Sequence, residues 1–501
     1  MTLRAALPLL AGLLITLAGC RKTEPYQTPA APAPEAYKEA PPESFKEARD
    51  SQGSKSTQDS KDWKASAPAD SIARGKWWEI FHDPVLNALE ESVTVSNQTL
   101  KSAEARFRQA RALIRESRSA RLPTVNAGGS IMRDRLSQNS GVPAPATETE
   151  YGDFNLGVDA EYEVDLWARV RNLIAASVES AQATAADLEN VRLSLHAELA
   201  LDYFDLRSLD RERRILDSAV EAYSQALALT RRRFEGGVAN QVDVAEAETQ
   251  LEATRAQQID ITELRAQYEH AIAALTGQTA ESFSLAENTT PLTPPVIPVG
   301  VPSDLLERRP DIAAAERRVA AANSQVGLTK AAFFPTVMLG VTAGVEGSSI
   351  ANWFNWPSRL WALGPSAVQT LFDAGRRRAV TEGAVANYDA TVADYRQSVL
   401  SAFQQVEDHI ASLRVLEDES RRQRLAVGAA RRSESLSLNR YKGGLVNYLE
   451  VATAQTVTLQ NERIQAGVER RQMEASVLLI KTLGGGWDKA SLPTPELLTA
   501  R

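Results

Sequence analysis

The chain has 501 residues with a formal net charge of −8. This acidic balance gives no reason to expect nucleic-acid binding, because phosphate contacts need a clustered basic surface. A single cysteine excludes an internal disulfide, and the four histidines lack the spacing of a metal site. Since no nucleophile motif or phosphate-binding loop is present either, we predict no enzymatic activity, no metal and no cofactor.

The first twenty residues are typical of a secretory signal. Arg4 precedes an apolar stretch, residues 5–17, that is too short to span a bilayer by itself. Residues 17–20 read Leu-Ala-Gly-Cys, which resembles the lipobox of bacterial lipoproteins. The resemblance implies that Cys20 is lipidated and becomes the mature N-terminus, and Arg21 in place of an aspartate implies export to the outer membrane. The alternative is a chance cysteine in a discarded signal.

A proline-, alanine- and glutamate-rich segment follows, over residues 20–75. It has too few large apolar groups to fold independently, so we expect a lipidated tether, part of which lies along the body. Order begins near Trp77, and a helical pattern runs from residue 84 to about residue 121, where Pro123 ends it.

Two segments have the period-two alternation of strands. Residues 154–164 alternate strictly between apolar and polar side chains, and in residues 336–345 valine, leucine and alanine alternate with threonine, methionine and glycine. Weaker partners lie near residues 124–134 and 360–372, so each half of the chain contributes one hairpin. Strands of about ten residues match the length that crosses a bilayer at a tilt, although a half-buried soluble sheet is the alternative. Aromatic residues that would suit a membrane interface cluster beside the second hairpin: Trp353, Phe354, Trp356 and Trp361.

A long helical run without proline follows each predicted hairpin, over residues 168–234 and 376–441. At 1.5 Å per residue each helix would be about 100 Å long and would need neighbouring helices to bury its apolar side. The second run has the four–three spacing of a coiled-coil seam at Val399, Phe403, Val406, Ile410 and Leu413. The seam of the first run drifts toward that of a straight helix at Val191, Leu195, Leu199, Tyr203 and Leu206.

Each run ends in a motif that occurs twice. Residues 233–244 return as residues 440–451, a shift of 207 positions from residue 233 to residue 440, and the same shift carries Gly277 onto Gly484. Glycine pairs end both helices, and an asparagine follows that can cap the returning helix. Such a long period indicates a duplicated half. We divide the chain into a signal peptide (1–19), a tether (20–75), a first repeat (76–276), a linker (277–302), a second repeat (303–486) and a tail (487–501).

These features together resemble the outer-membrane factor family, the trimeric channel-tunnels of tripartite efflux and secretion systems, and most closely its lipoprotein branch. The lipobox, both tip motifs and the segments 165–169 and 371–376, which follow the hairpins, carry the resemblance. It implies a mostly α protein with a membrane β-barrel. Three chains would pool four strands each into a 12-stranded barrel, continued in the periplasm by a long α-helical coiled-coil barrel. Independently, four strands cannot close a membrane barrel alone, which predicts an oligomer.

The function that this resemblance implies is that of an outer-membrane efflux channel without chemistry of its own. A lipid-anchored homotrimer in the outer membrane, extending into the periplasm, would pass small molecules outward from an inner-membrane pump and a periplasmic adaptor (membrane fusion) protein. Two alternatives are a lipid-anchored periplasmic coiled-coil scaffold and a secretion channel for polypeptides. The strict alternation at residues 154–164 argues against the scaffold, and the transported solute is not identified.

The resemblance also implies three sets of site residues. The adaptor would meet the tips at Arg233, Gly236, Gly237, Asn240, Asp243, Arg440, Gly443, Gly444 and Asn447. Paired glycines permit close approach and arginines offer several donors, although these residues can also serve only to turn and cap the helices. The periplasmic constriction would lie at Leu449, Thr453 and Thr456, and because many relatives place charges at the two threonine positions, we predict that closure here rests more on Leu449. The barrel lumen would receive Asp159, Glu161 and Glu163 and favour cations, unless these are solvated carboxylates outside a sheet.

Overall fold

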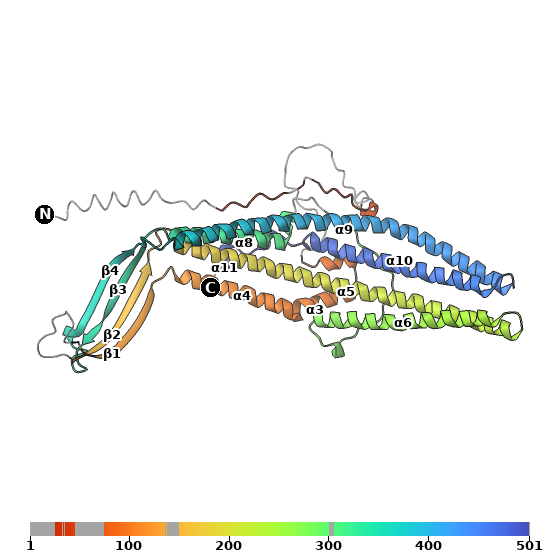
Figure 1. The fold of residues 1–501 in the computed structure, drawn as a ribbon, viewed down its shortest axis with the longest axis horizontal. Helices are drawn as coiled ribbons and strands as arrows, with labels where there is room; N and C mark the ends of the chain where they lie inside the picture. The colour runs from red at the N-terminus through yellow and green to blue at the C-terminus, as the bar shows by residue number, and fades with distance from the viewer. Residues whose placement is uncertain are drawn as a thin grey trace.

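The computed structural model describes residues 26–32, 34, 36–45, 75–135, 137, 150–299 and 305–499. The predicted signal peptide and Cys20 lie outside these residues. The body is elongated, with a four-stranded sheet at one end and the tips of two helical hairpins at the other (Figure 1). Among the described residues, no helix combines the length and the hydrophobicity needed to cross a membrane.

The first half of the chain contains two short helices, one strand pair and a long helical hairpin. Its elements are η1 (Trp77–Phe81), α3 (Pro84–Ser96), α4 (Gln98–Ser119), β1 (Thr124–Arg135), β2 (Glu150–Glu163), α5 (Arg169–Glu235), α6 (Gln241–Leu275) and η2 (Ala280–Ser282). The expectation of one continuous helix over residues 84–121 is wrong, because the chain breaks at Asn97. The Asn97 side chain accepts from the Leu100 N–H at 2.9 Å and donates to the Leu275 carbonyl at 2.8 Å, so it starts α4 and ties it to the end of α6.

The second half repeats this order. Its elements are α7 (Leu305–Arg308), α8 (Pro310–Ala331), β3 (Thr336–Gly347), η4 (Trp356–Ser358), β4 (Arg359–Val368), α9 (Arg376–Lys442), α10 (Tyr448–Thr482), η5 (Lys489–Ser491) and α11 (Pro495–Thr499). The fourth strand ends at Val368, so the expectation that it continues to Phe372 is wrong. Asp373 accepts from the N–H groups of Gly375 and Arg377 at 3.2 Å each, which commits this stretch to starting α9.

The sheet is antiparallel throughout, in the order β1-β2-β3-β4. The central β2–β3 pairing joins the two halves of the chain. The predicted long helices are confirmed: α5 and α9 have 67 residues each, which corresponds to about 100 Å. The predicted seam of α9, from Val399 to Leu413, is buried at every position, and that of α5 is buried from Leu195 to Leu206 but only half-buried at Val191.

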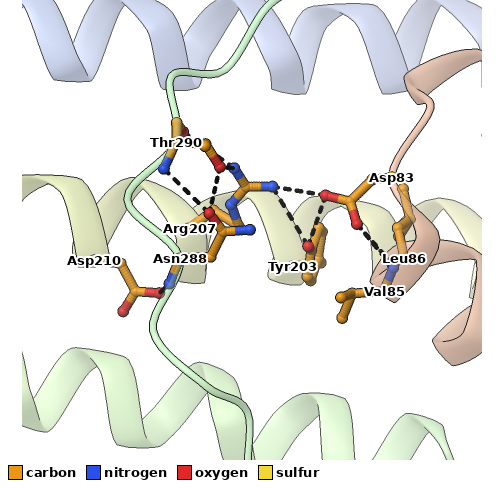
Figure 2. Close-up of polar contacts among 8 residues, drawn as sticks. All are labelled: Asp83, Val85, Leu86, Tyr203, Arg207, Asp210, Asn288 and Thr290. Atoms are coloured by element: carbon orange, nitrogen blue, oxygen red, sulfur yellow. Dashed lines mark hydrogen bonds and ion pairs between the residues drawn. The ribbon is translucent and has the colours of Figure 1, made fainter.

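A polar cluster in the middle of α5 holds the start of the body and the linker together (Figure 2). Asp83 caps α3 and also accepts from the Tyr203 hydroxyl at 2.7 Å and from Arg207 at 2.6 Å. Arg207 in turn donates to the hydroxyl of Thr290 at 2.7 Å and to its carbonyl at 3.1 Å. Because Arg207 is buried, these bonds replace the water that its guanidinium would otherwise need. They fix the linker against α5.

Described residues near both chain ends pack onto the body. The predicted tether contacts α9: Glu407 accepts from the N–H groups of Lys38 and Glu39 at 2.7 and 2.9 Å. Near the C-terminus, Leu498 of α11 is buried, and Arg118 donates to the Thr499 carbonyl at 2.7 Å. Both ends therefore reinforce the part of the body between the sheet and the hairpins.

Candidate functional site

The strand register gathers apolar side chains from all four strands on one face of the sheet. Directly paired residues of neighbouring strands point to the same side. Val158 of β2 pairs with Ala127 of β1 and with Ala343 of β3, and Ala343 pairs with Trp361 of β4. Trp361 is 79% exposed and Leu363, also of β4, is 62% exposed. The sheet thus turns a largely apolar face outward, and the rest of the described chain leaves Trp361 and Leu363 on it uncovered.

The opposite face carries the carboxylates that were expected to line a lumen. Asp159, Glu161 and Glu163 alternate with the apolar residues of β2 and lie on one face. Asp159 accepts a hydrogen bond from the side chain of its partner Asn126 at 3.0 Å. Glu163 forms an ion pair with Arg169, the first residue of α5, which compensates its charge. Of these three residues, only Glu163 has its charge compensated by an ion pair within the described chain.

The predicted interfacial aromatic residues lie in and beside the connection between β3 and β4, at the end of the sheet away from the helices (Figure 1). Trp353 packs on Phe154 of β2 with ring centroids 5.7 Å apart. Trp356 is 76% exposed, and the Arg359 guanidinium lies 4.1 Å from its ring centroid. Rings that combine exposure with a nearby charged group suit a boundary between lipid and water.

The two hairpin tips have the same backbone conformation but differ in how the returning helix is capped. The second glycine of each pair is left-handed, with φ of 74° at Gly237 and 75° at Gly444, as the helix-ending motif requires. Asn240 and Asp243 form a reciprocal capping box at the start of α6. The same expectation fails for Asn447, whose side chain makes no cap bond to α10. The position equivalent to Asp243 holds the longer Glu450, which pairs with Arg440 at 2.8 Å instead of reaching back to the cap.

Arg233 joins the two tips of one chain. Its guanidinium donates to the Tyr441 carbonyl and lies 4.5 Å from the centroid of the Tyr441 ring. The Tyr441 hydroxyl donates to Thr230 at 3.1 Å, and its ring meets that of Tyr448 edge-on. Tyr441 and Tyr448 are both buried and belong to a small apolar core between the hairpins. Arg233, expected to contact an adaptor, is thus engaged within the chain.

The predicted constriction residues lie on the first turns of α10 with their side chains largely in solvent. Leu449 is 54% exposed. The hydroxyls of Thr453 and Thr456 donate to the carbonyls of Leu449 and Ala452, one turn earlier on the same helix, at 2.8 Å each. Threonine carries no charge, so neither residue can form a charge lock, and Leu449 is the exposed apolar residue among the three.

Sequence reasoning missed the bridges that hold the second hairpin against the first. Arg463 of α10 donates to Glu212 of α5 at 2.6 Å and to Gln257 of α6 at 3.0 Å. Tyr223 donates to the Gln455 carbonyl at 3.2 Å closer to the tips. A groove of about 450 Å³ is lined by Arg463, Glu212, Gln257 and four further residues of α10, including Thr456. Glu212 and Arg463 are 251 positions apart, so no local spacing marks them as partners.

Half-buried carboxyl groups on α5 and α10 have raised pKa values. Burial raises the pKa of Glu474 to about 7, and hydrogen bonding with Asp205 adds to this rise against the opposing effect of Arg470. Burial, with Glu198 and Asp205 nearby, raises the pKa of Asp202 to about 6. Such carboxyl groups change charge near neutral pH rather than in acid.

Comparison with known proteins gives concordant results. The family model described as "Outer membrane efflux protein" matches residues 90–278 and 301–485. The toluene efflux pump outer membrane protein TtgC of Pseudomonas putida is 30% identical over 498 residues, covering 96% of this chain and 97% of TtgC. The structure of the outer-membrane channel OprN superposes with a TM-score of 0.79 at 29% identity, covering 93% of this chain and all of that one. That of VceC from Vibrio cholerae gives 0.76 at 26% identity, covering 82% and 99%.

The similarity extends over nearly the whole chain and includes both the sheet and the long helical hairpins. The relatives are outer-membrane components of efflux pumps, and the family is one of transport channels rather than enzymes. The chain therefore belongs to the outer membrane efflux protein family.

Proposed function

We propose that three copies of this chain form a 12-stranded outer-membrane β-barrel continued by an α-helical tube, and that this conduit passes small molecules outward from a tripartite pump. The proposal is carried by the sheet, whose four strands gather exposed apolar side chains, such as Val158, Trp361 and Leu363, on one face. Exposing such a face to water is unfavourable, at roughly 25 cal/mol per Å² of apolar area, whereas hydrocarbon covers it at no such cost.

The sheet edges support the trimer. Within the described part of the chain, β1 and β4 each pair on one side only. An open strand edge in lipid leaves backbone N–H and C=O groups unsatisfied at several kcal/mol each, so β4 of one copy must pair with β1 of another. The polar face then looks inward, where three copies bring together six carboxylates of Asp159 and Glu161.

The other site assignments follow from this arrangement. Lipidation at Cys20 would anchor the tether, whose described residues already run along α9. The exposed parts of the tips would meet the adaptor, through Gly236, Gly443 and their neighbours rather than through Arg233 alone. Leu449 would narrow the periplasmic aperture. The two segments matched by the family model, residues 90–278 and 301–485, support the division into two repeats.

The two alternative functions are less well supported. A periplasmic scaffold would leave the apolar sheet face in water. A polypeptide secretion channel is not favoured by the relatives, since TtgC is named as part of a toluene efflux pump, and toluene is a small apolar molecule.

Conductance and sedimentation test the proposal together. We expect the detergent-solubilised protein to sediment as a trimer and to form cation-preferring channels in planar lipid bilayers. Asp159→Asn combined with Glu161→Gln should reduce the cation preference, whereas Glu281→Gln, in the turn η2, should not. Sedimentation as a monomer, or bilayers that stay silent with a trimeric sample, would refute the channel.

A further inference from the structure

Arg233 of the first tip and Tyr441 of the second tip form a contact that we call the clasp. The equivalent residues of the repeated motif do not form such a contact within one chain. The clasp consists of the Arg233 guanidinium, the Tyr441 carbonyl and the Tyr441 ring, with Gly444 beside it. A Cβ at Gly444 would lie 3.7 Å from Nη2 of Arg233, so the guanidinium passes directly over this glycine. In the other copy of the motif, the shift of 207 positions maps these residues onto Arg440, Phe234 and Gly237.

The mapped positions are open. Phe234 is 41% exposed, whereas its equivalent Tyr441 is 2% exposed. A Cβ at Gly237 would meet nothing within 4 Å, whereas Gly444 has Arg233 against it. The first tip thus exposes an aromatic ring and a left-handed glycine like those that Arg233 contacts on the second tip, but no arginine side chain in the described part of the chain contacts them.

We propose that Arg440 of one copy docks on Phe234 and over Gly237 of the next copy, repeating between chains the clasp that Arg233 and Tyr441 make within a chain. This inference rests on the proposed trimer. Six tips would then be held by three clasps within chains and three between chains. Each interchain clasp would combine Arg440 of one copy with Phe234 of another.

The internal repeat is the reason to assign a second copy as the partner. Within the chain, α10 packs against both α5 and α6. Carrying this packing forward by one repeat places α6 of the next copy against α9 and α10 of the first. The same correspondence between repeats maps Arg233 onto Arg440, and Tyr441 onto Phe234 of the next copy. One pseudo-symmetry relation therefore predicts both the helix packing and the clasp between copies.

The interchain clasp is weaker by construction. Phe234 lacks the hydroxyl group that Tyr441 uses to donate a hydrogen bond to Thr230 at 3.1 Å. Arg440 is also shared with Glu450 at 2.8 Å, although an arginine has donors enough for both a carboxylate and a neighbouring carbonyl. The ring of tips therefore opens first at the three seams between chains.

Crosslinking tests this arrangement in the full-length protein. Phe234→Cys combined with Arg440→Cys, treated with a short bismaleimide, should give covalent dimers and trimers on a denaturing gel. The matched pair Arg233→Cys with Tyr441→Cys should crosslink within the chain and migrate as a monomer. The unsubstituted protein, which carries only Cys20, and a pair with the distant, exposed Ile259→Cys should give no interchain product.

The outcomes separate this inference from the trimer itself. If the sample sediments as a trimer but the Phe234/Arg440 pair gives only monomers, the clasp is refuted and the trimer stands. If the sample sediments as a monomer, both fail.

A second measurement keeps the arginine in place. Since an exposed cation–π contact is modest, Phe234→Leu should raise the open probability in planar bilayers by on the order of two- to fivefold. Phe234→Tyr, which restores the hydroxyl, should lower it. Val238→Ala, at a position 69% exposed and outside the clasp, serves as the control. Equal behaviour of all three variants would overturn the proposal.

Discussion

Replacing Arg463 by methionine should loosen the second hairpin from the first. The guanidinium bridges Glu212 and Gln257 at 2.6 and 3.0 Å, and methionine keeps the length of the side chain without its donors. The Arg463 side chain is 39% exposed and that of Glu212 is 22% exposed, so we assign the ion pair only the upper part of the surface range, about 1 kcal/mol. The bond to Gln257 adds up to about 1 kcal/mol.

A loss of about 1–2 kcal/mol corresponds to roughly a five- to thirtyfold shift in a two-state equilibrium. If α10 must leave α5 and α6 for the aperture to widen, the ratio of open to closed time in single-channel recordings should rise by that factor. Glu212→Gln should produce part of the same increase, and adding it to Arg463→Met should produce little more, because the shared contact is already lost.

Arg431→Met is the matched control. Arg431 pairs with Glu462 at 2.6 Å, but this pair links α9 to α10 within one hairpin and does not cross to the other. Its loss should leave the ratio of open to closed time unchanged. An unchanged ratio in Arg463→Met, or an equal rise in Arg431→Met, would refute the idea that the interhairpin bridge holds the channel closed.

Three further predictions concern stability and membrane insertion. The pKa of Glu474 in the folded protein lies at about 7, above its ordinary value of 4.5. The protonated carboxyl group therefore contributes fully to the free energy of unfolding below about pH 4.5, and this contribution is lost as the pH rises through 7. Glu474→Gln should therefore flatten the decline in melting temperature over this interval, and an unaltered decline would contradict the assignment. Gly277→Ala should lower the melting temperature, because φ is 73° and the new Cβ would lie 2.7 Å from the Ser96 carbonyl oxygen, whereas Gly467→Ala, in an open helical position, should raise it slightly. Val158→Lys should disfavour membrane insertion by about 2–4 kcal/mol, measured as partitioning of refolded protein into vesicles, and normal partitioning would place this face away from lipid.

Several elements could be predicted from local pattern alone. Period-two alternation predicted β2 and β3, because the two sides of a strand meet different surroundings and the side chains record this directly. The seam of α9 is buried from Val399 to Leu413, as its four–three spacing indicated. The duplicated motif predicted two tips, and both Gly237 and Gly444 adopt the left-handed conformation. In each case the signal lies within a few residues of the feature that it predicts.

The predictions that failed depend on what a neighbour offers. The Asn447 side chain does not cap α10, and Glu450 pairs with Arg440 rather than completing a capping box. The helix over residues 84–121 breaks at Asn97, where the amide finds the Leu275 carbonyl across the body. Glu163 was expected to add negative charge to a lumen, but Arg169 compensates it. Local propensity leaves both options open at such positions, and the tertiary partner selects one.

The sequence by itself determined the strands, the long helices, the tips and the repeat, since each follows from periodicity or from a backbone conformation that only certain residues adopt. Only the tertiary structure decided which polar groups meet: Arg463 with Glu212, Arg207 with Thr290, and Arg233 with Tyr441. The physical reason is the distance along the chain over which each feature is determined. Side-chain periodicity is a property of a few consecutive residues, whereas a hydrogen bond between helices depends on the register and rotation of segments that lie far apart along the chain.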